Sequence, residues 1–355
     1  MSKKREYELD FLRILAAFFV MLHHSELAEL YHSGAVGMAG SFVLCCVTCL
    51  IVINVPMFFL LSGALLLDRQ EPDRVVYRKR IPRFVLLTFL VTAFTYAYRC
   101  YSDFHVKNLF WGFFAGNMDV THWYLYAYLG FLVCLPFLRR AVRGMTHTDA
   151  LVLVGLRFLF GTLLPGIGYL AEYKGWPSPP FSDAFSVPLA TADLLFYPIL
   201  GYYLENKLPW AKADWKWPAL SLTAIAGGVL ASALVTCHQG LRTGFTGSFL
   251  RLFVYSTAMG VFVLVKYLFT RSHRAGKCRR SFETVLKFLS PLMLGVYILE
   301  PVLRPAVKPL LTGWMGPEAG PILISVWYCV FGMLAYSAIT WLLILILFKM
   351  FHQSG

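Results

Sequence analysis

Hydrophobic residues fall in long blocks along this chain, and short polar segments separate the blocks. A block of about 20 apolar residues is long enough to cross the hydrocarbon core of a bilayer as a helix. A membrane β-barrel would show alternating segments of about 10 residues instead, and the chain lacks that alternation. The pattern predicts an all-α, polytopic membrane helix bundle of about ten transmembrane helices, over residues 9–30, 38–67, 83–102, 121–138, 149–170, 186–205, 217–236, 247–269, 285–303 and 321–350.

Three segments depart from a plain succession of spans. The second and last blocks are longer than a bilayer needs, so these helices are expected to tilt or to extend beyond it. Asn54 and Pro56 lie inside the second block and predict a kink or break there, because proline removes a backbone donor. The aromatic-rich stretch 105–117 is too short to cross, and we expect it to lie in the membrane interface.

The composition excludes a soluble globular protein. Hydrophobic residues make up 58% of the 355 residues and charged residues only 14%, whereas soluble domains carry about 25% charged residues. The net charge of +13 suggests a nucleic-acid partner at first. However, the basic residues stand in short clusters between apolar blocks, as they do in cytoplasmic loops. We therefore expect contact with membrane lipids and no nucleic acid.

The basic residues also predict the orientation. With the N-terminus inside and the spans alternating, the cytoplasmic segments hold about 23 Lys and Arg residues and the outer segments about 7. This asymmetry recurs loop by loop, so we expect an even number of spans and cytoplasmic N- and C-termini. Residues 1–355 are expected to form a single integral membrane domain. The basic start, 3–5, has no cleavage site after the first apolar block and predicts a retained signal-anchor.

Eight cysteines raise the alternatives of disulfides or a metal site. Five of them lie inside apolar blocks, and no pair has the spacing of a zinc site or a redox motif. We interpret them as small buried hydrophobic residues and expect no metal.

The first span carries ionisable residues, which indicate function because a bilayer makes them costly unless they are paired or hydrated. Asp10 and Arg13 are three residues apart, share a helix face and can pair. Arg13 and His24 are three turns plus about 20° apart, so they also share a face, about 16 Å apart along the axis. A cation then lies near one membrane surface and an imidazole near the other. The alternative is an interfacial ion pair with His24 capping the helix end.

A second cluster, 77–83, lies at the cytoplasmic mouth of the third span and includes Arg78, Arg80 and Arg83. Such a cluster is typical of an ordinary positive-inside anchor. The alternative is a phosphate site, because guanidinium forks bind phosphate oxygens well.

Four further positions break the apolar pattern. Ser62, followed by a glycine, is small enough to let helices approach closely. His122 and Trp123 open the fourth span, where aromatic residues are common at the interface. Glu300 ends the ninth span on the outer side. Its carboxylate is either solvated, which its position alone favours, or it orients His24.

Together these residues resemble membrane acyltransferase family 3, over nearly the whole chain. The family's signature of a basic residue, ten intervening residues and a histidine fits Arg13 and His24. Its Arg-x-x-Arg motif fits Arg80 and Arg83. Two weaker segments are similar as well: Pro-x-Phe-Phe-x-x-Ser-Gly at 56–63 and Trp-Tyr-Leu at 123–125. One departure is Glu300, which stands where the family often has a late histidine.

The resemblance implies an O-acyltransferase that takes an acyl group, expected to be acetyl, from cytoplasmic acyl-CoA. The acceptor would be a hydroxyl on an extracytoplasmic molecule such as a cell-envelope glycan, and the setting a bacterial inner or plasma membrane. The expected roles divide into three groups. At the reacting centre we expect His24 as the base, together with Arg13, Asp10 and Glu300. The residues expected to bind acetyl-CoA are Arg80, Arg83, Arg78 and Ser62. The residues expected to bind the acceptor are His122 and Trp123. Direct transfer is favoured over an acyl-imidazole.

Two other functions stay open on the sequence. An exporter or flippase of polysaccharide or lipid-linked material would need a continuous path and discontinuous helices. A membrane sensor or binding module would need no acyl donor. Binding of acetyl-CoA to the purified protein separates the acyltransferase from both.

Overall fold

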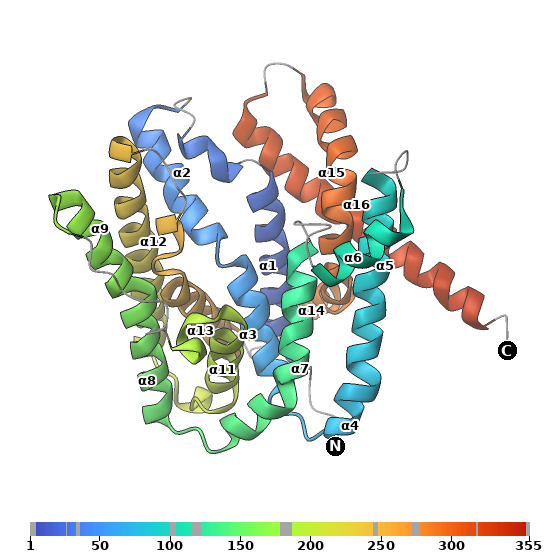
Figure 1. Cartoon of the computed structure of the whole chain (residues 1–355), viewed down its shortest axis with the longest axis horizontal. Coiled ribbons are helices and arrows are strands. Elements are labelled where there is room, and N and C mark those ends of the chain that lie inside the picture. The colour runs from blue at the N-terminus through green and yellow to red at the C-terminus, as the bar shows by residue number, and fades with distance from the viewer. Residues whose placement is uncertain are drawn as a thin grey trace. The chain divides into compact units, whose positions relative to one another are not determined.

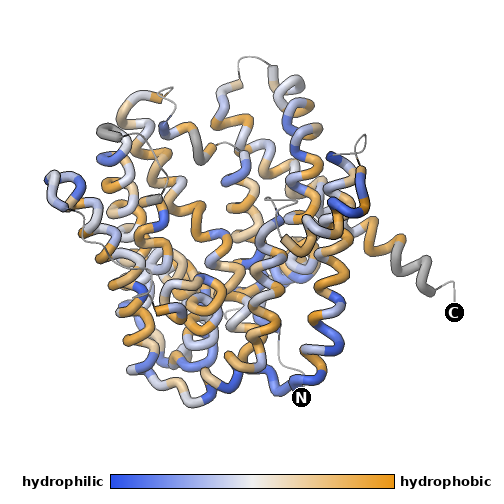
Figure 2. The backbone as a smooth tube through the Cα atoms, viewed as in Figure 1, coloured by the Kyte–Doolittle hydropathy of each residue, from blue (hydrophilic) through white to orange (hydrophobic). Residues whose placement is uncertain are grey.

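The computed structural model describes residues 5–25, 27–32, 36–99, 104–115, 122–177, 187–243, 248–271, 277–316 and 319–352. All regular secondary structure in these ranges is helical. Apolar residues run along the helices, and polar residues concentrate at helix ends and connections (Figure 2). Within the described ranges, eight helices are long and apolar enough to cross a membrane: Gly37–Leu66, Asp73–Arg99, Trp123–Arg143, His147–Lys174, Lys216–Gly240, Phe249–Arg271, Arg280–Met315 and Pro321–Ile346.

These helices confirm a polytopic helical bundle. Two predicted spans are not among the eight, for different physical reasons. Helix α1 (Tyr7–His24) is apolar overall but carries Glu8, Asp10 and Arg13 in its first two turns. Helix α11 (Asp193–Asn206) is only 14 residues long, shorter than a straight crossing requires. The count of ten and the cytoplasmic termini therefore stay predictions.

The chain divides into two compact units, one formed by Met1–Phe58 with Pro209–Gly355 and the other by Phe59–Leu208. The single domain expected over residues 1–355 stays a prediction.

The first unit is arranged around α1 (Figure 1). This helix contacts α2, α13, α14, α15 and α16. Leu9, Leu12, Ala16 and Val20 recur at intervals of three or four residues and are buried, as expected for a helix with several neighbours. The other elements are η1 (Leu27–His32), α2 (Gly37–Ile51), the start of α3 (Asn54–Leu66), η7 (Trp210–Lys212), α12 (Lys216–Thr243), η8 (Ser248–Arg251), α13 (Val254–Arg271), α14 (Lys277–Leu289), η9 (Ser290–Leu292), α15 (Met293–Met315) and α16 (Pro321–His352).

The break predicted in the second block is confirmed. Helix α2 ends at Ile51, a turn covers 52–53, and α3 begins at Asn54. The Asn54 side chain accepts a hydrogen bond from the backbone N–H of Val55 at 2.6 Å. Pro56 lies in the first turn of α3, where its missing N–H has no intrahelical partner to lose.

The second unit contains helices that lie against the rest of α3. Gly63 and Gly201 allow a backbone-to-backbone contact between α3 and α11. A Cβ added to Gly63 would lie 1.8 Å from the carbonyl oxygen of Pro198, and one added to Gly201 would lie 2.0 Å from that of Leu60. The close approach expected of the small residues near Ser62 is thus confirmed at Gly63. The elements of this unit are α4 (Asp73–Val75), η2 (Val76–Arg80), α5 (Ile81–Arg99), α6 (Val106–Ala115), α7 (Trp123–Arg143), α8 (His147–Phe158), η5 (Leu159–Leu163), α9 (Leu164–Lys174), α10 (Pro188–Thr191) and α11.

The aromatic-rich stretch expected at the interface forms the short helix α6. Phe110, Trp111 and Phe114 are exposed on it, as a helix bound to a membrane surface requires. Its position at the interface stays a prediction.

Candidate active site

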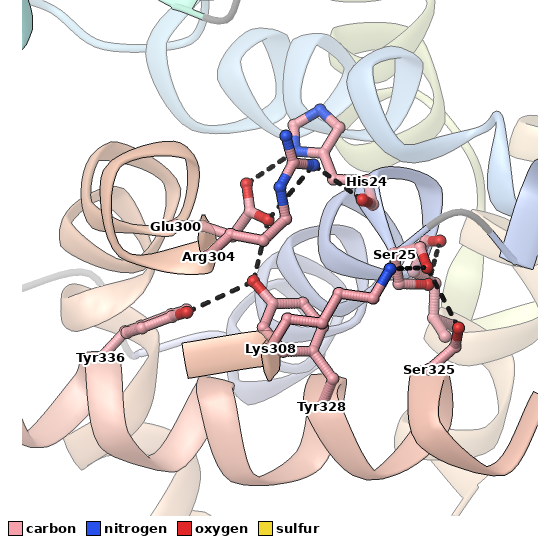
Figure 3. Close-up of polar contacts among 9 residues, drawn as sticks. His24, Ser25, Glu300, Arg304, Lys308, Ser325, Tyr328 and Tyr336 are labelled. Carbon is pink, nitrogen blue, oxygen red and sulfur yellow. Dashed lines mark hydrogen bonds and ion pairs between the residues drawn. The ribbon is translucent and has the colours of Figure 1, made fainter. Parts of the chain in front are cut away.

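The C-terminal end of α1 meets α15 through a histidine and a carboxylate. The Nδ1 atom of His24 is 2.7 Å from Oε2 of Glu300, although 276 positions separate the two residues (Figure 3). Glu300 is fully buried, with 0% of its surface exposed. The interpretation that this carboxylate is solvated is therefore wrong, because its place inside the helix bundle removes it from water.

The other oxygen of Glu300 is also engaged. The hydroxyl of Tyr328 on α16 donates to Oε1 at 3.0 Å, and the Tyr336 hydroxyl lies 3.2 Å from that of Tyr328. Arg304, one turn after Glu300 on α15, has a guanidinium nitrogen 3.7 Å from Oε1. The buried carboxylate thus has hydrogen-bond donors and a cation, which offset the free-energy cost of its burial.

Three side chains from α15 and α16 hold the end of α1. Arg304 donates to the backbone carbonyl of His24 at 2.6 Å. Lys308 and Ser325 donate to the carbonyl of Ser25 at 3.3 and 3.0 Å. Carbonyls at a helix C-terminus have no intrahelical partner and attract cations. The alternative in which the His24 side chain caps this helix is wrong, since these groups do so and the imidazole turns to Glu300.

The N-terminal end of α1 carries a second polar cluster. Asp10 accepts hydrogen bonds from Arg5 and from the Ser290 hydroxyl, both at 2.6 Å. Arg13 lies 3.5 Å from Asp10 and donates to Ser290 at 2.7 Å. The predicted Asp10–Arg13 pair is confirmed, and Ser290 of η9 bridges it. One stripe of α1 therefore carries Arg13 near one end and His24 at the other, about 16 Å apart at 1.5 Å per residue.

The second unit has a basic cluster around one carboxylate. Arg80 donates to both oxygens of Glu71 at 3.0 Å, and Arg139 of α7, only 3% exposed, donates to Oε2 at 3.1 Å. Burial raises the pKa of the Glu71 carboxyl, but the hydrogen bonds and charges of Arg80 and Arg139 outweigh it, so the pKa lies below its ordinary value. Arg78 and Arg83 are exposed. The structure therefore assigns Arg80 an ion-pair partner and leaves Arg83 on the surface.

The predicted acceptor residues lie at the other end of α7. His122 is completely buried next to the first residue of this helix, and Trp123 is 44% exposed. Sixteen residues from Trp123 to Arg139 correspond to about 24 Å along the axis. Ser62 is buried in the same unit, in α3. His122 and the arginine cluster thus lie at opposite ends of helix α7, just as His24 and Arg13 lie toward opposite ends of α1.

Several groups that complete these clusters were not predicted from the sequence, and four of them bear directly on the two carboxylates. Arg304 and Tyr328 contact Glu300, Tyr336 contacts the hydroxyl of Tyr328, and Glu71 pairs with two arginines. Only the tyrosines gave a signal: polar hydroxyls eight residues apart share a face of an otherwise apolar helix. Glu71 lies in the segment that connects α3 to α4. Helical periodicity does not apply to such a segment, so the ion pairs of Glu71 could not be predicted from residue spacing.

A family model described as an acyltransferase domain matches residues 6–345. The match includes both units and all the residues of the clusters described above except Arg5. No curated protein and no solved structure matches this chain.

Proposed function

The chain belongs to membrane acyltransferase family 3, and we propose that it transfers an acetyl group from cytoplasmic acetyl-CoA to a hydroxyl of an extracytoplasmic acceptor. The acceptor we propose is a glycan of the cell envelope, and the setting is a bacterial plasma membrane. The observation that supports this proposal best is the hydrogen bond between His24 and the buried carboxylate of Glu300.

This hydrogen bond suits a general base. A carboxylate only accepts hydrogen bonds, so an ionised Glu300 requires the hydrogen of a neutral imidazole to be on Nδ1. The lone pair is then on Nε2, which points away from Glu300 (Figure 3). His24 is a quarter exposed, which leaves this nitrogen room to meet a substrate. Glu300 would also stabilise the imidazolium that forms when His24 takes a proton.

The reaction follows from this arrangement. Nε2 of His24 takes the proton of the acceptor hydroxyl while the oxygen attacks the thioester carbonyl. The tetrahedral intermediate then expels the thiolate of coenzyme A, which receives the proton from the imidazolium. The products are an O-acetyl ester and the free thiol, and His24 returns to its neutral form.

The donor would be bound by cations near the cytoplasmic surface. Arg80, Arg83 and Arg78 supply guanidinium groups for the phosphates of the coenzyme, and Ser62 is proposed to line its path. The pantetheine arm of the coenzyme is long and thin, so it could carry the thioester at its end from the cytoplasmic surface toward the outer one. Arg13, held by Asp10 and Ser290, would contact this arm or offset charge developing near it. His122 and Trp123 are proposed to contact the acceptor.

The direct test replaces His24 with alanine. Membrane vesicles from cells that produce the chain would receive labelled acetyl-CoA, and label incorporated into envelope material would be counted. We expect His24→Ala to reduce incorporation by at least about 10²-fold, the usual contribution of a general base. The matched control is His32→Ala, an exposed histidine of η1, which should retain the rate. Equal incorporation by both variants, at equal protein levels, would contradict the proposal.

A further inference from the structure

One guanidinium group contacts both members of the His24–Glu300 pair. Nη1 of Arg304 donates to the backbone carbonyl of His24 at 2.6 Å and lies 3.7 Å from Oε1 of Glu300. The Arg304 side chain as a whole is 31% exposed. Figure 3 shows the Arg304 side chain beside the imidazole and the carboxylate. Arg304 is thus placed to control both the position of His24 and the charge of its partner.

The charge of Glu300 decides which nitrogen of His24 can act as a base. If Glu300 were protonated, it could donate its hydrogen to Nδ1 of His24, and the ring hydrogen would move to Nε2. The nitrogen that faces away from Glu300 would then have no lone pair for a substrate proton. A carboxylate buried as completely as Glu300 is costly unless a positive charge and hydrogen-bond donors compensate it.

The groups around Glu300 identify the source of that stabilisation. His24 faces it from α1; Arg304 and Lys308 are on its own helix, α15; Tyr328, Cys329 and Tyr336 face it from α16. Within this set only the arginine and the lysine carry a permanent positive charge. The lysine donates to the Ser25 carbonyl, whereas Arg304 forms the ion pair with Glu300.

We propose that Arg304 is a positioning residue of the acyl transfer, which keeps Glu300 ionised and thereby holds His24 in the tautomer whose Nε2 accepts a proton. The backbone hydrogen bond contributes by fixing the last turn of α1, which carries the imidazole. This inference rests on the proposed role of His24 as the base. Arg304 itself need not touch the substrate.

Two substitutions separate the charge of Arg304 from its shape. Arg304→Gln removes the charge and keeps a polar donor, although its amide nitrogen stands where Nε of the arginine does. Arg304→Lys retains the charge but replaces the fork with a single ammonium group. Ser325→Ala is the matched control, because it removes a hydrogen bond to the end of α1 without changing any charge.

The first measurement is the pH dependence of acetyl transfer by the full-length protein in proteoliposomes. For Arg304→Gln we expect turnover at pH 7 to fall about tenfold with little change in KM for acetyl-CoA. The pH at which activity falls to half its maximum on the acid side should rise by about one unit, the usual effect of losing an adjacent opposite charge. Arg304→Lys should restore most of the rate, and Ser325→Ala should leave the acid side of the profile unchanged.

The second measurement does not depend on activity. The ¹⁵N resonances of His24, assigned by their loss in His24→Ala, report which ring nitrogen carries the hydrogen. We expect Nδ1–H in the unchanged protein and a larger share of Nε2–H in Arg304→Gln. Unchanged ring resonances and an unchanged pH profile in that variant would overturn the inference. If the unchanged protein showed the expected tautomer, and Arg304→Gln shifted it, but no acetyl transfer occurred, the proposed function would fail, whereas the control of the His24 tautomer by Arg304 would stand. If Arg304→Gln does not fold, Arg304→Lys is compared with Glu300→Gln, in which the partner of His24 is neutral. A pH profile and His24 resonances of Arg304→Lys that are identical to those of Glu300→Gln would refute the role of the charge.

Discussion

Replacing Glu300 with glutamine changes one atom of the proposed pair and should remove most of the activity. In the unchanged protein Oε1 accepts from Tyr328 and Oε2 contacts Nδ1 of His24. If the glutamine oxygen stays with Tyr328, its NH₂ group faces His24 at about the same 2.7 Å. An amide NH₂ can only donate, so Nδ1 would have to accept and the ring hydrogen would move to Nε2.

The opposite orientation of the amide is unfavourable. It would return the oxygen to His24 but place the NH₂ group toward Arg304, whose guanidinium lies 3.7 Å from the present Oε1. Both groups are donors, so this orientation exchanges an attraction for a repulsion. The first orientation, with the inactive tautomer, should therefore predominate.

The size of the effect follows from the loss of the base. In serine proteases, where the orienting carboxylate is replaced by its amide, turnover falls by about 10⁴. We expect a loss of about 10³ to 10⁴ for Glu300→Gln, which corresponds to roughly 4 to 5.5 kcal/mol of activation free energy.

The assay is acetyl transfer from labelled acetyl-CoA in membrane vesicles, normalised to folded protein measured by size-exclusion chromatography in detergent. The matched control is Glu172→Gln, an exposed carboxylate of α9, which should retain full activity. A rate for Glu300→Gln within about threefold of that of the unchanged protein would refute the role of the tautomer, because a small population of the active tautomer could not sustain so high a rate.

Three further results are expected. Gly63→Ala should lower the free energy of unfolding by about 3 kcal/mol or more, because the new methyl group would overlap the carbonyl of Pro198; thermal unfolding in detergent measures this, and Gly130→Ala, which meets nothing within 4 Å, should match the unchanged protein. Because the pKa of Glu71 is lowered in the folded protein, its ion pairs stabilise the fold above the ordinary carboxyl range, and this contribution is lost as the pH falls through the pKa of the folded state. The difference in melting temperature between the unchanged protein and Glu71→Gln should therefore be largest near neutral pH and shrink on acidification. Arg83→Ala, which breaks no ion pair resolved among the described residues, should weaken acetyl-CoA binding by about tenfold or more in equilibrium dialysis; unchanged affinity would reduce this arginine to a membrane anchor.

Local spacing predicted the polar features within α1. The pairing of Asp10 with Arg13 and the shared face of Arg13 and His24 depend only on helix geometry, so they could be predicted before any tertiary contact was known. The break before Asn54 followed in the same way from the chemistry of proline.

Contacts between distant segments could not be predicted by such rules. Glu300 is 276 positions from His24, and its membrane position alone favoured solvation. The ion pair of Arg80 with Glu71 was not predicted, because Glu71 lies nine residues before Arg80 and outside the basic motif. In both cases the missing information is which segments of the chain pack against each other, and a single sequence does not state this directly.

The reciprocal contact of α3 and α11 has a mechanical consequence. Each helix places a carbonyl oxygen where the other lacks a side chain, at Gly63 opposite Pro198 and at Gly201 opposite Leu60. Sliding either helix by one residue, about 1.5 Å, would bring the β-carbon of a neighbouring residue against a backbone carbonyl. The two helices are therefore locked in register, and any rearrangement within the second unit must take place at other helix pairs.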